Sequence, residues 1–183
     1  NPEDGSYDNW QLMIEFVVDL VDKLDIGSDR TRVGLVRFSN FARNVFYLNS
    51  YYNKEDIKNA VRGMGYDGGT TNIYDGLRLL REEQFRDFNG DRSGFDNLAI
   101  VVTDGKSTVQ PELTIPEAEL VHADNIKVYA VGITTEINID ELRSIASPPQ
   151  ILDQNYFLSE DFQGLDVVGE ALGNQACAGA RTD

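Results

Sequence analysis

The spacing of apolar residues along the chain predicts alternating strands and helices. Residues 98–102 form an unbroken apolar run, which is typical of a strand buried on both faces. Residues 10–24 instead place apolar side chains three or four positions apart, as on one face of a helix. By the same criteria we expect strands at 31–39, 41–48, 127–133 and 156–158, and helices at 54–64, 72–85, 111–124, 139–146 and 162–172.

This order of elements predicts an α/β fold with a doubly wound, mostly parallel central sheet flanked by helices, as in Rossmann-like proteins. A short loop separates the strands at 31–39 and 41–48, so we expect them to form a hairpin that adds one antiparallel strand at an edge. The chain has 183 residues, and we expect one domain over 1–183, with residues 176–183 as a tail.

Two loops of the predicted fold carry oxygen-bearing side chains. Asp104 follows directly after the strand at 98–102, at the end of a strand where open α/β sheets bind their ligands. Thr71 ends a second loop, 67–71, immediately before a predicted helix. Taken alone, Asp104-Gly105 fits a plain turn as well as a ligand site. Carboxylate and hydroxyl oxygens without imidazole or thiolate suit a hard cation such as Mg²⁺.

Charge narrows the range of partners. The formal net charge is −15, which argues against nucleic acid and anionic membrane surfaces as partners and favours cations or a basic protein surface, although scattered charge can also serve solubility alone. No apolar run is long enough to insert into a membrane. His122 and Cys177 are the only residues of their types, so neither a zinc site nor a Ser-His-Asp arrangement is supported.

Four stretches of the chain point to one family. They are WQLMIEFVVDLVDKLDIGSDRTRVGLVRFS at 10–39, DGGTTNIYDGL at 67–77, NLAIVVTDGKST at 97–108 and IKVYAVGI at 126–133. In this order they resemble the von Willebrand factor type A (vWA) domain. The sequence is more similar to those of the extracellular-matrix members of the family, such as matrilins, collagen VI and byssal thread matrix proteins, than to integrin inserts.

The resemblance implies a metal-ion-dependent adhesion site (MIDAS) built from three loops. Thr71 and Asp104 correspond to the ligands from the second and third loops, and the implied cofactor is a divalent cation, Mg²⁺ first and Ca²⁺ or Mn²⁺ as alternatives. The neighbours expected to contact the ligand around the metal are Gly69, Thr70, Asn72, Gly105, Lys106 and Ser107.

The family's first loop, Asp-x-Ser-x-Ser, and the strand before it would precede Asn1, so we expect the first strand to be missing from this chain. That strand would lie between the strands at 31–39 and 97–103. Because neighbouring strands are about 4.8 Å apart, its absence would leave a gap of about 10 Å lined by unpaired backbone groups. The resemblance also implies that Cys177 pairs with a cysteine outside this chain and that the full protein has a possible second vWA domain.

The resemblance therefore implies a secreted adhesion module of the extracellular matrix. Such a module would bind a protein ligand, with collagen as the leading candidate, through an acidic side chain that completes the metal coordination. A structural matrix module that assembles through metal-independent surfaces is the alternative. We do not expect an enzyme, because Gly105-Lys106-Ser107 lacks the earlier glycine of a phosphate-binding loop, with Ile100 in its place, and no nucleophile–base pair is evident.

Overall fold

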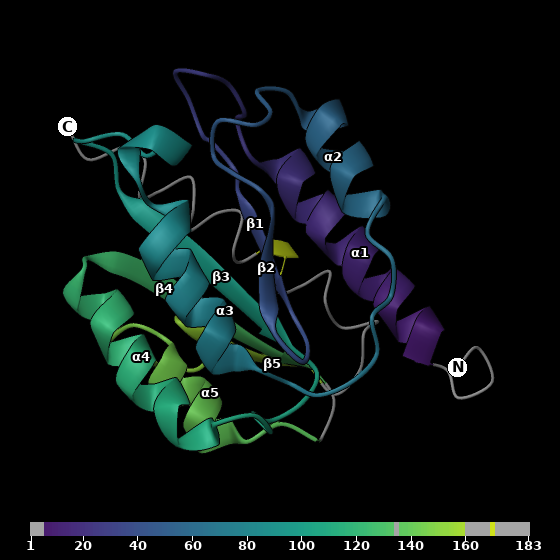
Figure 1. Cartoon of the computed structure of the whole chain (residues 1–183), viewed down its shortest axis with the longest axis vertical. Helices are drawn as coiled ribbons and strands as arrows, with labels where there is room; N and C mark the ends of the chain where they lie inside the picture. Colours follow the sequence, from purple (N-terminus) through teal and green to yellow (C-terminus); the bar gives the residue numbers. More distant parts are fainter. Residues whose placement is uncertain (1–5, 134–135, 160–168, 171–183) are drawn as a thin grey trace.

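The computed structural model describes residues 6–133, 136–159 and 169–170. Its order of elements is the expected alternation of helices and strands (Figure 1). The helices are α1 (Ser6–Lys23), α2 (Lys54–Arg62), α3 (Ile73–Leu79), α4 (Pro111–Ala123) and α5 (Ile139–Ile145). The strands are β1 (Leu35–Phe38), β2 (Ala42–Phe46), β3 (Asn97–Thr103), β4 (Ile126–Ile133) and β5 (Tyr156–Ser159). A π-helical turn at Leu80–Gln84 extends α3, and a short 3-10 helix follows at Asp87–Asn89.

Three parallel strands form the central sheet in the order β3-β4-β5. Asn97 lies opposite Ile126 and Thr103 opposite Gly132, so β3 and β4 end at the same edge of the sheet. The predicted hairpin is confirmed, because β1 and β2 pair antiparallel. The fold is thus the expected α/β class, with a parallel sheet and one antiparallel strand pair.

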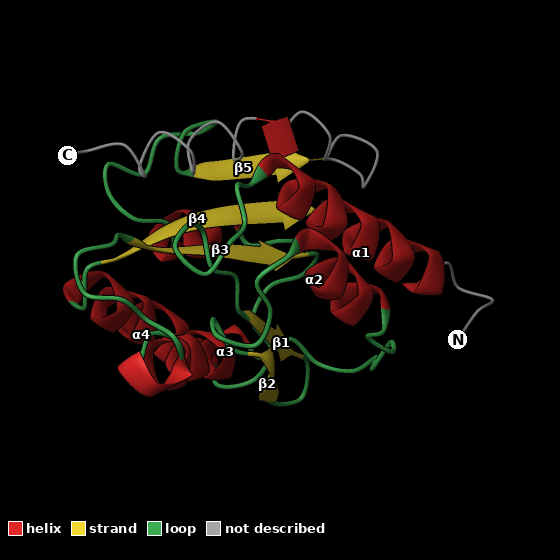
Figure 2. Ribbon diagram, turned by 90° about the horizontal axis from the view of Figure 1, so that it is seen from above, coloured by secondary structure: helices red, strands yellow, loops and turns green. Residues whose placement is uncertain are grey.

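Alternation along β3 and β4 divides the core into two layers. Ala99 and Val101 face α3, α4 and α5, together with the side chains of Val128 and Ala130 on β4. The intervening residues of both strands face α1, where they pack on Phe16 and Leu20. Viewed from above, the parallel sheet accordingly lies between α1 on one side and α3 and α4 on the other (Figure 2). This period of two is what a strand buried on both faces requires.

The hairpin belongs to a third cluster of buried residues. Phe46 of β2 packs with Ile14, Val18 and Val21 of α1 and with the buried face of α2. Asn53 caps the amino end of α2 by accepting a hydrogen bond from the Asp56 N–H at 2.9 Å. Helix α2 therefore ties α1 and the hairpin into the same folded unit.

Three local details of the helices do not follow from the apolar pattern. Helix α1 begins at Ser6, so Asp8 and Asn9 lie inside it. Pro116 lies within α4, which nevertheless starts at Pro111. Ile115 and Leu120 are exposed, and the buried face of α4 consists of Thr114, Glu117, Ala118 and Val121.

Within the described residues, β1 and β3 are not paired, and the strands form two separate sheets. The additional strand that we expect between them stays a prediction. The predicted last helix at 162–172 lies outside the described residues except for 169–170, as do Cys177 and the tail at 176–183. Among the described helices, none has the length and apolar character needed to cross a membrane.

Candidate metal-ion site

The turn that carries Asp104 is shaped by the last residue of β3. The buried Thr103 hydroxyl donates a hydrogen bond to the Gly105 carbonyl at 2.7 Å and accepts one from the Gly105 N–H at 3.3 Å. Both bonds turn the chain away from the sheet directly at Asp104. As a result, Asp104 and Lys106 are exposed at the carboxyl end of the central sheet.

Thr71 is placed by the start of α3. The next residue, Asn72, is the N-cap of this helix and accepts a hydrogen bond from the Asp75 N–H at 3.1 Å. Asn72 is itself buried, and its side-chain amide donates to the carbonyl of Asn40 at 3.1 Å. Thr71 is therefore held between the loop at 67–70 and a fixed helix start.

Two strong hydrogen bonds join the second loop, 67–71, to the third loop, 103–108. The Thr71 N–H donates to the Thr108 hydroxyl at 2.9 Å, and the Thr108 N–H donates to the Thr71 carbonyl at 2.9 Å. The Thr71 hydroxyl oxygen lies 3.5 Å from where a methyl group on Gly105 would be. Thus the hydroxyl of Thr71 faces the Asp104–Gly105 turn, although 33 residues separate Thr71 from Asp104 in sequence.

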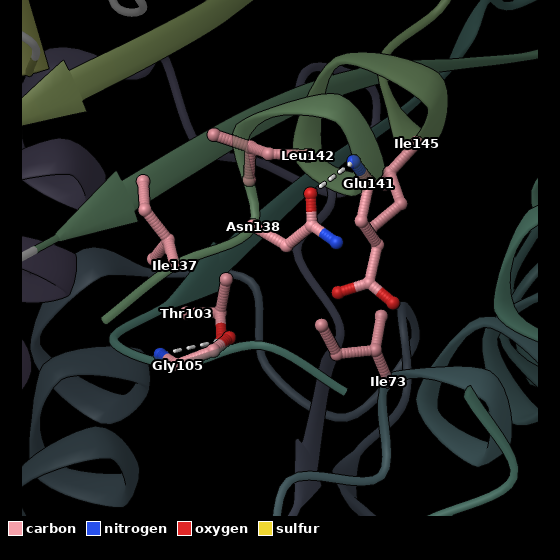
Figure 3. Close-up of a pocket in the computed structure, with 8 residues that line it drawn as sticks. All are labelled: Ile73, Thr103, Gly105, Ile137, Asn138, Glu141, Leu142 and Ile145. Carbon is pink, nitrogen blue, oxygen red and sulfur yellow. Dashed lines mark hydrogen bonds between the residues drawn. The ribbon is translucent and has the colours of Figure 1, made fainter. Parts of the chain in front are cut away.

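Helix α5 supports the third loop on its buried side. The Ser107 N–H donates to the Glu141 carboxylate at 3.0 Å, and the hydroxyls of Ser107 and Thr114 lie 2.9 Å apart. Ser107, which we expected around the metal, is only 6% exposed and so supports the loop from inside. Figure 3 shows Glu141 on α5 above Ile73 and near the Thr103–Gly105 turn.

The crevice in Figure 3 does not form a small-molecule site. It lies between the third loop, α3 and α5, and its wall is largely apolar, with Ile73, Ile137, Leu142 and Ile145 beside Glu141. It has no room for a water molecule. The exposed side chains of this region lie instead on the outer face of the loops, and they are Asp104, Lys106 and Thr108.

The second loop approaches the β1–β2 turn closely. Gly69 has a φ of +139°, and a methyl group on it would lie 2.5 Å from the Asn40 side-chain oxygen. Only glycine accommodates both this backbone conformation and this approach. Thr70 donates to the same Asn40 oxygen from its N–H at 2.9 Å and from its hydroxyl at 2.8 Å.

Asp75 links the first turn of α3 to the hairpin. Its carboxylate accepts a hydrogen bond from the Ala42 N–H at 2.7 Å and pairs with Arg78 at 2.7 Å. Burial by itself would raise the pKa of Asp75, but the Ala42 N–H and the Arg78 guanidinium outweigh burial and lower the pKa. Asp75 is therefore ionised at neutral pH and acts as a structural anchor beside the site.

The donor set at the loop surface fits a hard cation. Thr71 offers a hydroxyl oxygen and the neighbouring turn offers the Asp104 carboxylate, both of which are ligand types of Mg²⁺ and related ions. The described part of the chain holds no cluster of three or more His, Cys, Asp or Glu side chains that suits a metal. Two oxygen ligands leave most of an octahedral shell to be supplied by other groups.

Comparison with known proteins identifies the family. The profile of the von Willebrand factor type A domain matches residues 4–170. The chain belongs to this family. Human matrilin-1 is 34% identical to this vWA domain over 170 residues, which cover 93% of this chain and 33% of matrilin-1. Chicken integrin alpha-1 is 31% identical over 181 residues, covering 92% of this chain and 62% of the integrin sequence compared.

The solved structures give the same assignment. Proximal thread matrix protein 1 (PTMP1) from the mussel byssus superposes on this vWA domain with a TM-score of 0.85 and 30% sequence identity, over 94% of this chain and 44% of that one. A further PTMP1 structure, with a TM-score of 0.84 and 29% identity, over 93% of this chain and 43% of that one, has a zinc-occupied MIDAS motif. The vWA domain spans about a third of matrilin-1 and less than half of the crystallised PTMP1 chain.

Sequence reasoning singled out Thr71 and Asp104 but gave no role to Asn40 or Glu141. Asn40 stands in a hairpin turn, where asparagine is common for reasons of backbone geometry alone. Glu141 stands three residues after the helix cap Asn138, a spacing that indicates a capping motif and not a contact with a distant loop. Sequence alone offers no signal for either contact.

Proposed function

We propose that this vWA domain is an adhesion module of the extracellular matrix. A divalent cation, Mg²⁺ in the first instance, is held by Thr71 and Asp104 together with ligands that the family's first loop would supply. An acidic side chain of a protein ligand, with collagen as the proposed ligand, completes the coordination. The observation that carries the proposal is the pair of hydrogen bonds between Thr71 and Thr108, which brings the Thr71 hydroxyl to the Asp104–Gly105 turn.

Two further findings support this proposal. PTMP1, which is similar to this domain over 93% of this chain and 43% of its own, holds zinc in its MIDAS motif. Matrilin-1, the collagen alpha-1(XII) chain and integrin alpha-1 are similar to it over more than nine-tenths of the chain. These likenesses favour a secreted, non-enzymatic binding domain.

Two residues of this chain would have defined roles in such a site. Asp104 contributes negative charge, and Thr71 contributes a neutral oxygen. Together these two residues contribute one negative charge, so by themselves they leave one positive charge of a divalent cation uncompensated. A metal held in this way makes an anionic partner favourable for an otherwise acidic protein.

Capture on collagen-coated surfaces tests the proposal. The intact protein should bind in Mg²⁺, lose binding in EDTA and recover it when Mg²⁺ is restored. Asp104→Ala should abolish both capture and calorimetric Mn²⁺ binding, whereas Asp29→Ala, which removes another exposed carboxylate from the loop after α1, should change neither. Capture that persists in EDTA would contradict the proposal and favour the structural module that assembles without metal.

A further inference from the structure

The turn between β1 and β2 is attached to both neighbours of Thr71. The Asn40 side-chain oxygen accepts two hydrogen bonds from Thr70, at 2.9 and 2.8 Å. The Asn40 carbonyl accepts a third, from the Asn72 amide at 3.1 Å. Because Thr70 and Asn72 flank the proposed metal ligand, the turn has a fixed position next to it.

A second attachment reinforces the first. The Ala42 N–H, at the start of β2, donates to the Asp75 carboxylate in α3 at 2.7 Å. A methyl group on Gly76 of α3 would lie 2.9 Å from the Phe38 ring, so helix and hairpin are in close contact at this point. The turn is therefore part of the rigid surroundings of Thr71, at the lower end of the hairpin in Figure 1.

This turn presents an aromatic ring and an arginine to solvent. Phe41 is 57% exposed, and the guanidinium carbon of Arg43 lies 4.9 Å from the centre of its ring. The Arg43 side chain is 49% exposed. We refer to Phe41 and Arg43 as the Phe41–Arg43 platform. A guanidinium held over an aromatic face keeps a flat, defined orientation while its N–H groups stay accessible.

The platform arginine belongs to a cluster of two arginines and one aspartate. Arg37 and Arg43 both pair with Asp67, Arg43 at 3.6 Å, so two guanidiniums share one carboxylate. The protein as a whole carries a formal charge of −15. Because one carboxylate does not balance two guanidiniums, this cluster is complementary to a further carboxylate from an acidic partner.

We propose that the Phe41–Arg43 platform is a second contact point for the protein ligand, which binds as an acidic segment. One carboxylate of the segment completes the metal coordination, and a second carboxylate binds Arg43 while an apolar side chain packs on Phe41. This inference rests on the proposed metal-dependent function. It adds that the ligand carries at least two acidic residues and is recognised outside the metal shell.

The chemistry of both platform residues suits this task. Arginine can bind a carboxylate through two parallel N–H···O bonds, which sets orientation as well as affinity. Exposed aromatic and arginine side chains are over-represented at the centres of protein interfaces. Phe41 and Arg43 lie beside a fixed turn, so the ligand does not have to order a loop when it binds.

Matched substitutions test the platform in the intact protein, with collagen as the immobilised probe. Phe41→Ala and Arg43→Gln should each weaken Mg²⁺-dependent capture about threefold to tenfold and leave calorimetric Mn²⁺ affinity unchanged. The double variant should be only slightly weaker than either single variant, because the two side chains act together. Thermal unfolding midpoints should stay close to that of the parent, since both side chains are largely exposed.

The far end of the domain supplies the controls. Phe88→Ala removes a 77% exposed aromatic ring, and Arg30→Gln removes a 60% exposed arginine that pairs with Asp25. Neither should alter capture. If Phe41→Ala and Arg43→Gln capture collagen as well as the parent does, the platform inference is overturned while the metal-dependent function stands. If the parent shows no Mg²⁺-dependent capture, or if the Asp104→Ala variant keeps it, both proposals fail.

Discussion

Replacing Thr108 by valine tests whether the contact between the two loops prepares the metal site. The change keeps the shape of the side chain but removes the hydroxyl that accepts the Thr71 N–H at 2.9 Å. The bond from the Thr108 N–H to the Thr71 carbonyl stays available, because it uses only the backbone. Thr108→Val therefore removes one of the two strong bonds that hold Thr71 next to the Asp104–Gly105 turn.

The expected cost follows from the exposure of this site. A typical hydrogen bond contributes about 0.5–1.5 kcal/mol, and water can partly replace the lost acceptor because Thr108 is exposed. We expect the free energy of unfolding to fall by about 0.5–1 kcal/mol, which lowers Tm by about 1–4 °C for a domain of this size. If the lost rigidity must be regained on metal binding, about 1 kcal/mol corresponds to a roughly fivefold lower metal affinity.

Calorimetric Mn²⁺ titration and thermal unfolding of the intact protein provide the measurements. Thr108→Ser is the matched control, because it keeps the hydroxyl and should retain metal affinity close to that of the parent. The reasoning would be refuted if Thr108→Val bound Mn²⁺ as tightly as the parent and Thr108→Ser, with all three proteins folded. In that case the Thr71–Thr108 bond would be a stability feature without a role in the site.

Three further substitutions probe the surroundings of the site. Asp75→Asn should destabilise the fold by about 1–2 kcal/mol at pH 7, because a carboxylate with a lowered pKa accepts the Ala42 N–H. The difference should shrink as the pH falls below about 4, where Asp75 of the unfolded chain takes up its proton while the folded carboxyl does so only at lower pH. Glu141→Gln, which weakens the acceptor of the buried Ser107 N–H, should cost about 1–2 kcal/mol and weaken Mn²⁺ binding. Gly69→Ala should cost about 1–3 kcal/mol through its φ of +139°.

A different result would contradict each of these three predictions. Denaturant unfolding that gives Asp75→Asn the same deficit at pH 3 as at pH 7 would show that the charge of Asp75 is irrelevant. Mn²⁺ titration that shows full affinity for a folded Glu141→Gln variant would remove Glu141 from the support of the site. A Gly69→Ala variant as stable as the parent would mean that the loop at 67–71 can adopt another conformation without cost.

The strands and the layers of the core could be predicted from sequence because they follow apolar periodicity. The run at 98–102 became β3, and its alternate residues face opposite helical layers, as a strand buried on both sides requires. The buried face of α4 could not be predicted in this way. Thr114 is buried because its hydroxyl meets that of Ser107, and Glu117 because it pairs with Arg81 at 2.6 Å. Such partners are invisible to a pattern based on hydrophobicity.

The same distinction applies to the candidate site, where some residues could be predicted from sequence and others could not. Thr71 and Asp104 could be proposed from sequence because each borders a predicted element, carries an oxygen ligand and matches a motif of the family. The contacts of Thr108, Asn40 and Glu141 could not, since each joins segments 30 or more residues apart in the sequence. Only the folded arrangement shows that the third loop rests on α5 and that the hairpin turn borders the second loop.

The proposed ligand is acidic although the domain itself carries a large negative charge. Charges further than about 8 Å from the contact are largely screened at physiological ionic strength, so the net charge of −15 has little influence once the partners touch. At the loop surface itself, the proposed cation, Lys106 and Arg43 would oppose the charges of Asp104 and Asp67. Added salt should therefore weaken the exposed Arg43 contact more than the metal–carboxylate bond, and the salt dependence of capture should be shallower for Arg43→Gln than for the parent. An equal salt dependence would place Arg43 outside the interface.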